Sequence, residues 1–151
     1  MPFTTISSKV LPTGSVLQNV SASFVTQDST TSATYSNTSI TANITPSSTS
    51  SKILVSVHFK GGCITGDRAP RYAIFRDSTN ITGSSSTEGN NTYIASGHYR
   101  DHVTISKLDT PASSSQLTYV LKFRCQDGTS NTSYCGDSVG TSTITLTEIK
   151  G

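Results

Sequence analysis

Residues 44–59 read ITPSSTSSKILVSVHF, and this stretch constrains the fold more than any other part of the chain. From Ile53 onward, apolar side chains occupy every second position, and all but one of the residues between them are polar. A period of two is typical of a β-strand with one buried face. We predict that the apolar row belongs to the core; it consists of Ile53, Val55, Val57 and Phe59.

A second strand precedes this one. Apolar and polar residues also alternate over residues 40–45, and the two runs are separated by residues 46–51 (PSSTSS), a turn-forming cluster with no apolar member. We therefore expect the two strands to pair as a hairpin. Because a hairpin with one apolar face is not stable alone in water, a second sheet must cover residues 53–59.

The composition indicates a folded, hydroxyl-rich β protein. The 151 residues include 27 serines and 25 threonines, and charged residues make up 13%, against a typical share of about 25%. Apolar residues make up only 32%, but disordered chains combine low hydrophobicity with high net charge, and the net charge here is +2. A chain of this length fits one domain that buries roughly 70% of its unfolded surface.

Charge and hydropathy argue against two classes of partner. A net charge of +2 without a dense cluster of lysine and arginine gives no electrostatic footprint for nucleic acid. The chain has no long apolar run, and its first residues lack the basic and apolar regions of a secretion signal. We therefore expect synthesis in a cytoplasm, no signal-directed export and no membrane partner.

The three cysteines include no C-x-x-C pair. Cys125 and Cys135 flank a polar stretch and could face each other at the base of a hairpin loop. A disulfide there would stabilise the fold by roughly 2–3 kcal/mol, whereas a reducing cytoplasm would keep both thiols free. Both alternatives are open at this point, and Cys63 is expected to be a small buried or loop residue.

The first 13 residues show neither a strand period nor a helix period. We predict an extended arm over residues 1–13 and a β-sandwich domain over residues 14–151. The arm needs a surface for its apolar side chains, either on a neighbouring subunit or larger assembly, or on its own domain. These assembly residues are Phe3, Ile6, Val10 and Leu11.

Strand patterns recur along the rest of the chain, and no segment has helical periodicity. We predict an all-β fold, a single antiparallel β-sandwich of the jelly-roll type with eight to ten short strands and no significant helix. In the first strand, Val16, Val20, Ala22 and Phe24 should face inward. Besides the two strands above, the predicted strands cover residues 15–24, 33–35, 71–77, 92–97, 102–108, 117–125 and 142–149.

Two stretches rich in small polar residues, 79–91 and 126–133, predict surface loops. Loops of this kind are candidate contact sites for a partner. Their outward candidates are Ser84, Asn90, Asn91, Asp127 and Asn131.

Catalytic patterns are weak. Residues 136–140 match G-x-S-x-G, but a strand pattern follows in place of the helix that a hydrolase elbow needs, and no histidine comes after Ser138. A chymotrypsin-like order of His58, Asp101 and Ser138 exists, but nothing in the sequence places them together. We predict a turn at residues 136–140, no catalytic residue and no enzyme.

His98 and His102 have the spacing that binds one metal ion from a helix. On a strand they would lie about 13 Å apart, too far to share an ion within one chain. A site built from symmetry copies of one histidine in a trimer remains an alternative. We expect exposed residues here, and no metal or cofactor.

Five segments, considered together, point to a known family: VLQNVSA (16–22), ITPSSTSSKILVSV (44–57), FRDSTNI (75–81), ISKLDTPASSSQLTYVLKF (105–123) and STITLTEI (142–149). In this order and at these spacings they resemble small β-sandwich virion proteins and fibre-tip domains of tailed bacteriophages, especially those that infect cyanobacteria and other aquatic bacteria. The resemblance implies a jelly roll, no catalytic residues and a homotrimeric virion component. In fibres a long stalk usually precedes this domain, whereas only about 14 residues precede it here.

The expected function is therefore structural. The chain would be a trimeric capsid decoration or cement protein in the virion, contacting itself and phage capsid or tail proteins. The alternative is a tail-fibre-type module that recognises a host surface glycan through the loops at 79–91 and 126–133. The absence of tryptophan weakens this alternative, since many sugar-binding domains stack sugars on tryptophan.

Overall fold

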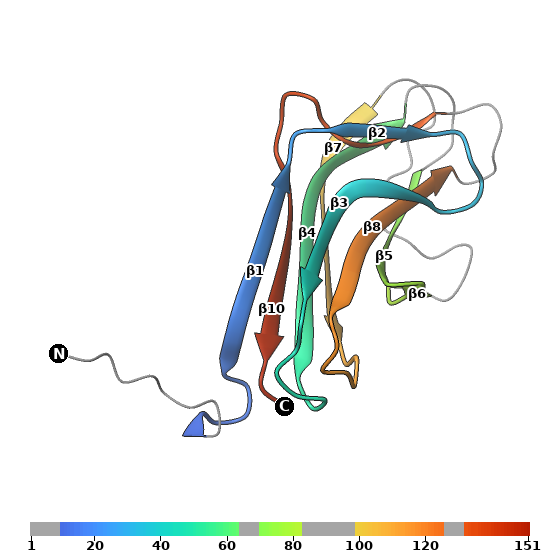
Figure 1. Cartoon of the computed structure of the whole chain (residues 1–151). Helices are drawn as coiled ribbons and strands as arrows, with labels where there is room; N and C mark the ends of the chain where they lie inside the picture. Colours follow the sequence, from blue (N-terminus) through green and yellow to red (C-terminus); the bar gives the residue numbers. More distant parts are fainter. Residues whose placement is uncertain (1–9, 64–69, 83–98, 126–131) are drawn as a thin grey trace.

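The computed structural model describes residues 10–63, 70–82, 99–125 and 132–151, which form two packed antiparallel β-sheets (Figure 1). No α-helix occurs in these ranges, so no helical segment there has the length and hydropathy to cross a bilayer. The strands are β1 (Val16–Phe24), β2 (Gln27–Thr30), β3 (Ser36–Ile44), β4 (Lys52–Cys63), β5 (Pro70–Arg76), β6 (Thr79–Asn80), β7 (Tyr99–Asp109), β8 (Leu117–Cys125), β9 (Ser133–Gly136) and β10 (Ser142–Ile149).

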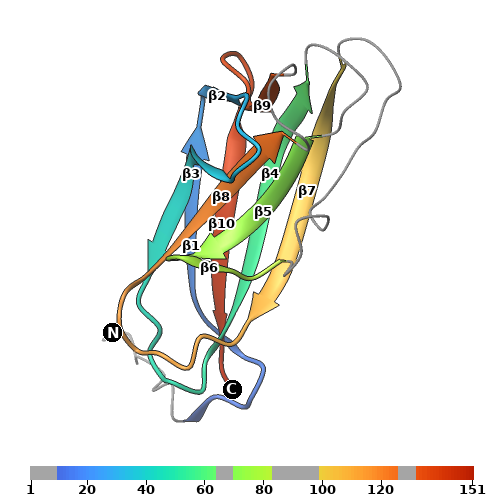
Figure 2. The ribbon, with the colours of Figure 1, turned by 90° about the vertical axis from the view of Figure 1, so that its right-hand side faces the viewer.

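The larger sheet has six strands in the order β1-β10-β4-β9-β2, with β7 paired to β4. Strand β4 pairs with β10 along its first part and with β9 at its end, so β7 occupies its other edge. The second sheet has the order β3-β8-β5-β6 and lies in front in Figure 2. The predicted antiparallel β-sandwich is thus confirmed, and its ten strands lie within the predicted number.

The core lies between the sheets and consists of alternating residues from both. The apolar row predicted from the sequence, Ile53, Val55, Val57 and Phe59, is completely buried. It packs in one cluster with residues of the second sheet, among them Tyr119 and Phe123. The period of two therefore identified the inward face of β4 correctly.

The predicted hairpin between residues 40–44 and 53–59 is wrong. Strand β3 pairs with β8 in the four-stranded sheet, whereas β4 lies in the six-stranded sheet. The linker at residues 45–51 therefore crosses from one sheet to the other, and the two strands contribute side chains to the core from opposite sheets. Both arrangements bury one face of each strand, so alternation alone does not distinguish them.

A buried carboxylate holds this linker. Glu148 is 0% exposed, and its Oε1 accepts hydrogen bonds from the N–H and hydroxyl of Ser47 at 2.7 and 2.6 Å and from the hydroxyl of Ser51 at 2.6 Å. Its Oε2 accepts one from Gln18 Nε2 at 2.6 Å. A long-range side-chain contact thus fixes the crossing, and residues 46–51 by themselves do not reveal it.

Two other strand predictions need correction. Residues 33–35 form no strand, while the polar residues 27–30 form β2 against β9. Val16 is 60% exposed and does not face inward, because the register between β1 and β10 shifts between Val16 and Gln18 and such a bulge turns the side chain to the other face. The predicted strand at 92–97 lies outside the described residues.

Strand β4 continues through Gly61 and Gly62, where the sequence pattern predicted its end. A side chain at Gly61 would meet the Tyr72 hydroxyl oxygen at 2.6 Å. That oxygen accepts a hydrogen bond from the Gly62 N–H at 2.8 Å and donates one to the Tyr134 carbonyl at 2.6 Å. Glycine is therefore required here for close packing between sheets, a role that a turn signal does not reveal.

Candidate functional site

The outer side of the six-stranded sheet carries an array of small uncharged polar side chains. In the strand register, Ser21, Thr145, Ser56 and Ser106 lie in one row across β1, β10, β4 and β7. The neighbouring row consists of Ser23, Thr143, His58 and Thr104. All eight are exposed or half-buried, and we call them the hydroxyl face.

Hydrogen bonds between strands arrange this face before any ligand arrives. Ser56 and Ser106 are joined at 3.0 Å, and Ser21 and Thr145 at 3.2 Å. His58 Nδ1 lies 3.0 Å from the Thr104 hydroxyl. Because a hydroxyl has one donor and two acceptor positions, each of these groups keeps capacity for a further partner.

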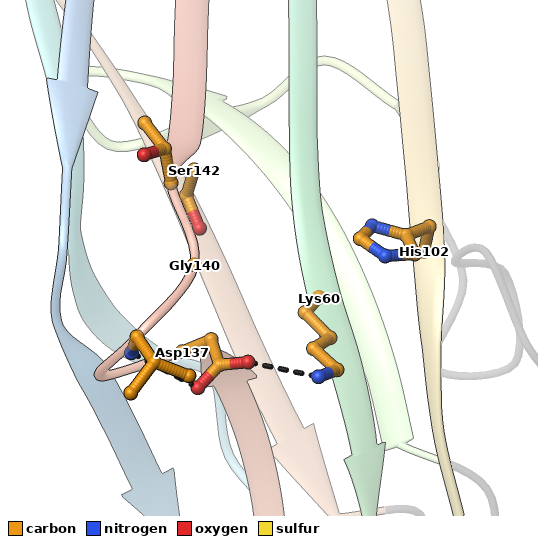
Figure 3. Close-up of a pocket in the computed structure, with 7 residues that line it drawn as sticks. Lys60, His102, Asp137, Gly140 and Ser142 are labelled. Atoms are coloured by element: carbon orange, nitrogen blue, oxygen red, sulfur yellow. Dashed lines mark hydrogen bonds and ion pairs between the residues drawn. The ribbon is translucent and has the colours of Figure 1, made fainter.

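A hollow of about 250 Å³ opens at the end of the hydroxyl face (Figure 3). Lys60 and His102, which pair in the register of β4 and β7, line one side of it. Its other side is the connection from β9 to β10, which begins at Asp137 and leads to Ser142. This connection has five residues, 137–141, and four of them line the hollow.

The charged groups of the hollow neutralise each other. Lys60 Nζ donates to Asp137 Oδ2 at 2.8 Å, drawn as a dashed line in Figure 3. The hydrogen bond from Lys60 and one from the Val139 N–H hold the pKa of Asp137 below its usual value. Asp137 is therefore ionised at neutral pH, and the pair has no net charge.

Ser142 also lines the hollow. The residue is 1% exposed, and its hydroxyl has no hydrogen-bond partner among the described residues. Buried polar groups are nearly always hydrogen-bonded. Its side chain stands in the inward row of β10 with Ile144 and Leu146, so the hydroxyl faces the interior of the sandwich and not the open side of the hollow.

The ring of His102 stacks on that of His58, and His98 lies outside the described residues. The two rings are 5.4 Å apart between centroids and parallel within 5°. Lone pairs of parallel imidazoles do not converge on one ion. Among the described residues, no group of three or more histidine, cysteine, aspartate and glutamate side chains could hold a metal ion.

The residues of the chymotrypsin-like order do not form a triad. His58 contacts Thr104, and Asp101 Oδ1 accepts a hydrogen bond from the backbone N–H of His102 at 2.8 Å. Ser138 is exposed in the connection between β9 and β10. Gly136 ends β9, and residues 137–141 lead to β10 through a bend at 138–140 and not through a strand-to-helix elbow.

The structure has free thiols at all three cysteines, so the disulfide alternative for Cys125 and Cys135 is wrong. Cys125 ends β8 in the four-stranded sheet and Cys135 lies in β9 of the six-stranded sheet, so the two do not flank a hairpin. Cys125 Sγ instead lies 3.1 Å from the Ser133 hydroxyl. Burial raises the pKa of Cys63 and of Cys135, which keeps both thiols protonated.

Two further carboxylates matter that the sequence patterns did not single out. Asp109 accepts two hydrogen bonds from Arg76, at 2.8 and 2.7 Å, and one from the Tyr119 hydroxyl at 2.8 Å. Burial, followed by that hydrogen bond, raises the pKa of Tyr119 well above its usual range. The buried position of Glu148 could have been recognised in the sequence, because this residue continues the inward row of Ile144 and Leu146.

The remaining candidates are placed as follows. Val10 is 77% exposed and Leu11 is half-buried, so the end of the arm nearest the domain does not enter the core. Phe3 and Ile6 lie outside the described residues. The loop candidates also lie outside them: Ser84, Asn90, Asn91, Asp127 and Asn131.

No protein-family model matches the chain, and no curated protein matches it.

Proposed function

We propose that this protein is a non-enzymatic structural component of a bacteriophage virion, a homotrimeric decoration protein that stabilises the capsid surface. Its partners would be its own copies and phage capsid or tail proteins, and neither nucleic acid nor membrane. The proposal starts from the resemblance of five sequence segments to small virion proteins. Three structural features support it, of which the strand order is the most important.

The strand order supports a jelly roll. If β1 with β2 and β9 with β10 are each taken as one interrupted strand, eight strands remain. One sheet then contains the first, eighth, third and sixth strands, and the other contains the second, seventh, fourth and fifth. We infer two interlocked Greek keys, the arrangement of jelly rolls in viral capsid proteins.

The use of the buried acids supports a scaffold role. Glu148 holds the linker between β3 and β4, and Asp109 joins β7 to Arg76 and Tyr119 of the opposite sheet. Asp28 Oδ2 accepts hydrogen bonds from the N–H and hydroxyl of Ser39, at 2.8 and 2.7 Å, and so joins β2 to β3. These carboxylates are engaged in holding elements together and not in a cleft where they could transfer protons.

An attachment surface is available at the end of the sandwich where β1 begins and β7 ends (Figure 1). Val10, Val16 and Leu108 are 77%, 60% and 47% exposed there. Strands β1 and β7 each pair on one side only within the described part of the chain. Exposed apolar side chains and open strand edges are the features that assembly would cover.

The test combines size with position. Light scattering of the purified protein should give a trimer, and a reconstruction of particles that contain it should place it on the capsid. Particles lacking the protein should lose their genome at a lower temperature than complete particles. A persistent monomer that leaves particle stability unchanged would refute the proposal.

The same reconstruction decides the tail-fibre alternative. Density at a tail tip would favour the glycan-recognition role over capsid decoration. The loop residues assigned to that role lie outside the described residues, so no contact in the structure favours it.

A further inference from the structure

We propose that the hollow beside Lys60 and Asp137 binds one sugar residue of a neutral polysaccharide, and that neighbouring sugars of the polymer lie along the hydroxyl face. This site is separate from the loops at 79–91 and 126–133. It also goes beyond a decoration role, because it would give the particle surface a ligand of its own.

The first argument is size. A hollow of about 250 Å³ is slightly smaller than the roughly 300–1,000 Å³ of sites for drug-sized molecules. It fits a single six-membered sugar ring. It lies open on one side, where the hydroxyl face begins, so the neighbouring rings of a polymer need not enter it.

The second argument is charge. Lys60 and Asp137 neutralise each other, and Arg100, whose charge also lowers the pKa of Asp137, is not among the residues that line the hollow. A phosphate or carboxylate would face the ionised Asp137, and a cation would face the Lys60 ammonium. An anionic or a cationic ligand would lose its hydration in the hollow without gaining an unpaired counter-charge there. A neutral ligand avoids this cost.

The third argument is the pattern of donors and acceptors. An ammonium has three N–H donors and a carboxylate has about four acceptor positions. Lys60 uses one donor on Asp137, and Asp137 uses one position on Lys60 and one on Val139. The unused N–H donors of Lys60 and the unused acceptor positions of Asp137 lie side by side. One sugar hydroxyl could accept a hydrogen bond from Lys60 while the adjacent hydroxyl donates one to Asp137.

The fourth argument is an apolar surface at the rim of the hollow. Val139 lines the hollow and is 89% exposed, so it offers this surface to the C–H groups of the ring. The hollow thus combines polar and apolar contacts, as sugar rings require.

The hydroxyl face argues for a polymer and not a free sugar. Its rows lead away from Lys60 and His102 along β4 and β7 through His58, Thr104, Ser56 and Ser106. The cross-strand hydrogen bonds already fix these side chains, so a ligand pays little entropy to order them. The parallel rings of His58 and His102 add a flat surface at the entrance to this path.

The experiment uses the whole protein with immobilised neutral polymers, namely a linear glucan, a mannan and a galactan. Acidic polysaccharides and free glucose, mannose and galactose are the comparison ligands. Two variants remove one polar group each: Lys60→Met in the hollow and Thr104→Val on the hydroxyl face. The matched control is Asn43→Ala, an exposed polar residue of β3 in the opposite sheet.

We expect at least one neutral polymer to bind, and each test variant to weaken binding about tenfold by the loss of one hydrogen bond. Asn43→Ala should bind like the unchanged protein. Thr104 is exposed, so Thr104→Val should fold even if Lys60→Met does not; thermal unfolding checks both. The site assignment is wrong if no neutral polymer binds, if an acidic polymer binds in its place, or if Asn43→Ala weakens binding equally. Equal affinity for free sugar and polymer would overturn the role of the hydroxyl face. None of these outcomes bears on trimer formation or capsid position.

Discussion

Two carboxylates, Glu148 and Asp137, differ in how many of their hydrogen-bond acceptor positions are occupied. Glu148 is completely buried, and three neighbouring residues supply four hydrogen bonds to it. Asp137 accepts one bond from Lys60 and one from a backbone N–H, at the edge of an open hollow. The first carboxylate is saturated and therefore structural. The second keeps capacity for a ligand.

The largest effect should come from removing Glu148. Glu148→Leu leaves the donors of Ser47, Ser51 and Gln18 buried without their acceptor, and we expect a loss of about 3–4 kcal/mol in the free energy of unfolding. Urea denaturation measures this loss. Glu148→Gln keeps the shape and one acceptor oxygen, so it should cost less. If both variants are as stable as the parent, the carboxylate does not hold the linker.

Asp109 should give the next largest effect. Asp109→Ala removes the partner of the Arg76 guanidinium and of the Tyr119 hydroxyl, and we expect a loss of about 2–3 kcal/mol, because Arg76 keeps partial access to water. The same urea experiment measures it. The double variant Asp109→Ala with Tyr119→Phe should lose less than the sum of the single changes. Strict additivity would contradict the contact between them.

The pH dependence of stability tests the role of Glu148 in another way. Burial alone would raise the pKa of Glu148, but hydrogen bonds from Ser47, Ser51 and Gln18 outweigh it, so the folded-state pKa lies below the unfolded one. The stabilisation is therefore complete above the unfolded pKa of about 4.3, and it is lost as pH falls through the folded-state value. Unfolding measured from about pH 6 down to about pH 2 should show this loss, and Glu148→Gln should show a shallower one. Identical pH profiles would refute the assignment.

The smallest effect should come from the Lys60 and Asp137 pair. The Lys60 side chain is 34% exposed and that of Asp137 8%, so water screens the pair from the lysine side and its contribution to stability is small. We expect the thermal midpoint of Lys60→Met to differ little from that of the parent, while its polysaccharide binding weakens. A large loss of stability in Lys60→Met would contradict this prediction and would show that the pair has a structural role like that of Glu148.

Much of the fold was predictable from local pattern. The alternation at residues 53–59 identified the inward row of β4 correctly, because the side chains of a strand point alternately to its two faces whatever its neighbours are. The core residues Ile53, Val55, Val57 and Phe59 follow from that rule alone. Strand β9 was missed because its four residues, SYCG, are too few to show a period.

The candidate site was less accessible. Its residues come from distant parts of the chain: Lys60 from β4, His102 from β7 and Asp137 from the connection after β9. Only the pairing of β4 with β7 and with β9 brings them together. Likewise, the rows of the hydroxyl face combine residues as distant in sequence as Ser21 and Thr145. No motif spacing marks such a site, since sheet neighbours are set by pairing and not by sequence distance.

The sequence by itself determined that the chain is an all-β sandwich and which side chains of β4 point inward. The tertiary structure decided which strands are partners. The stretch at residues 44–59 shows why: alternation requires that each strand bury one face, but a neighbour beside it and a strand stacked opposite it satisfy that requirement equally well. The choice depended on Glu148, 97 residues beyond Ser51 in the chain, whose hydrogen bonds hold the linker across the two sheets.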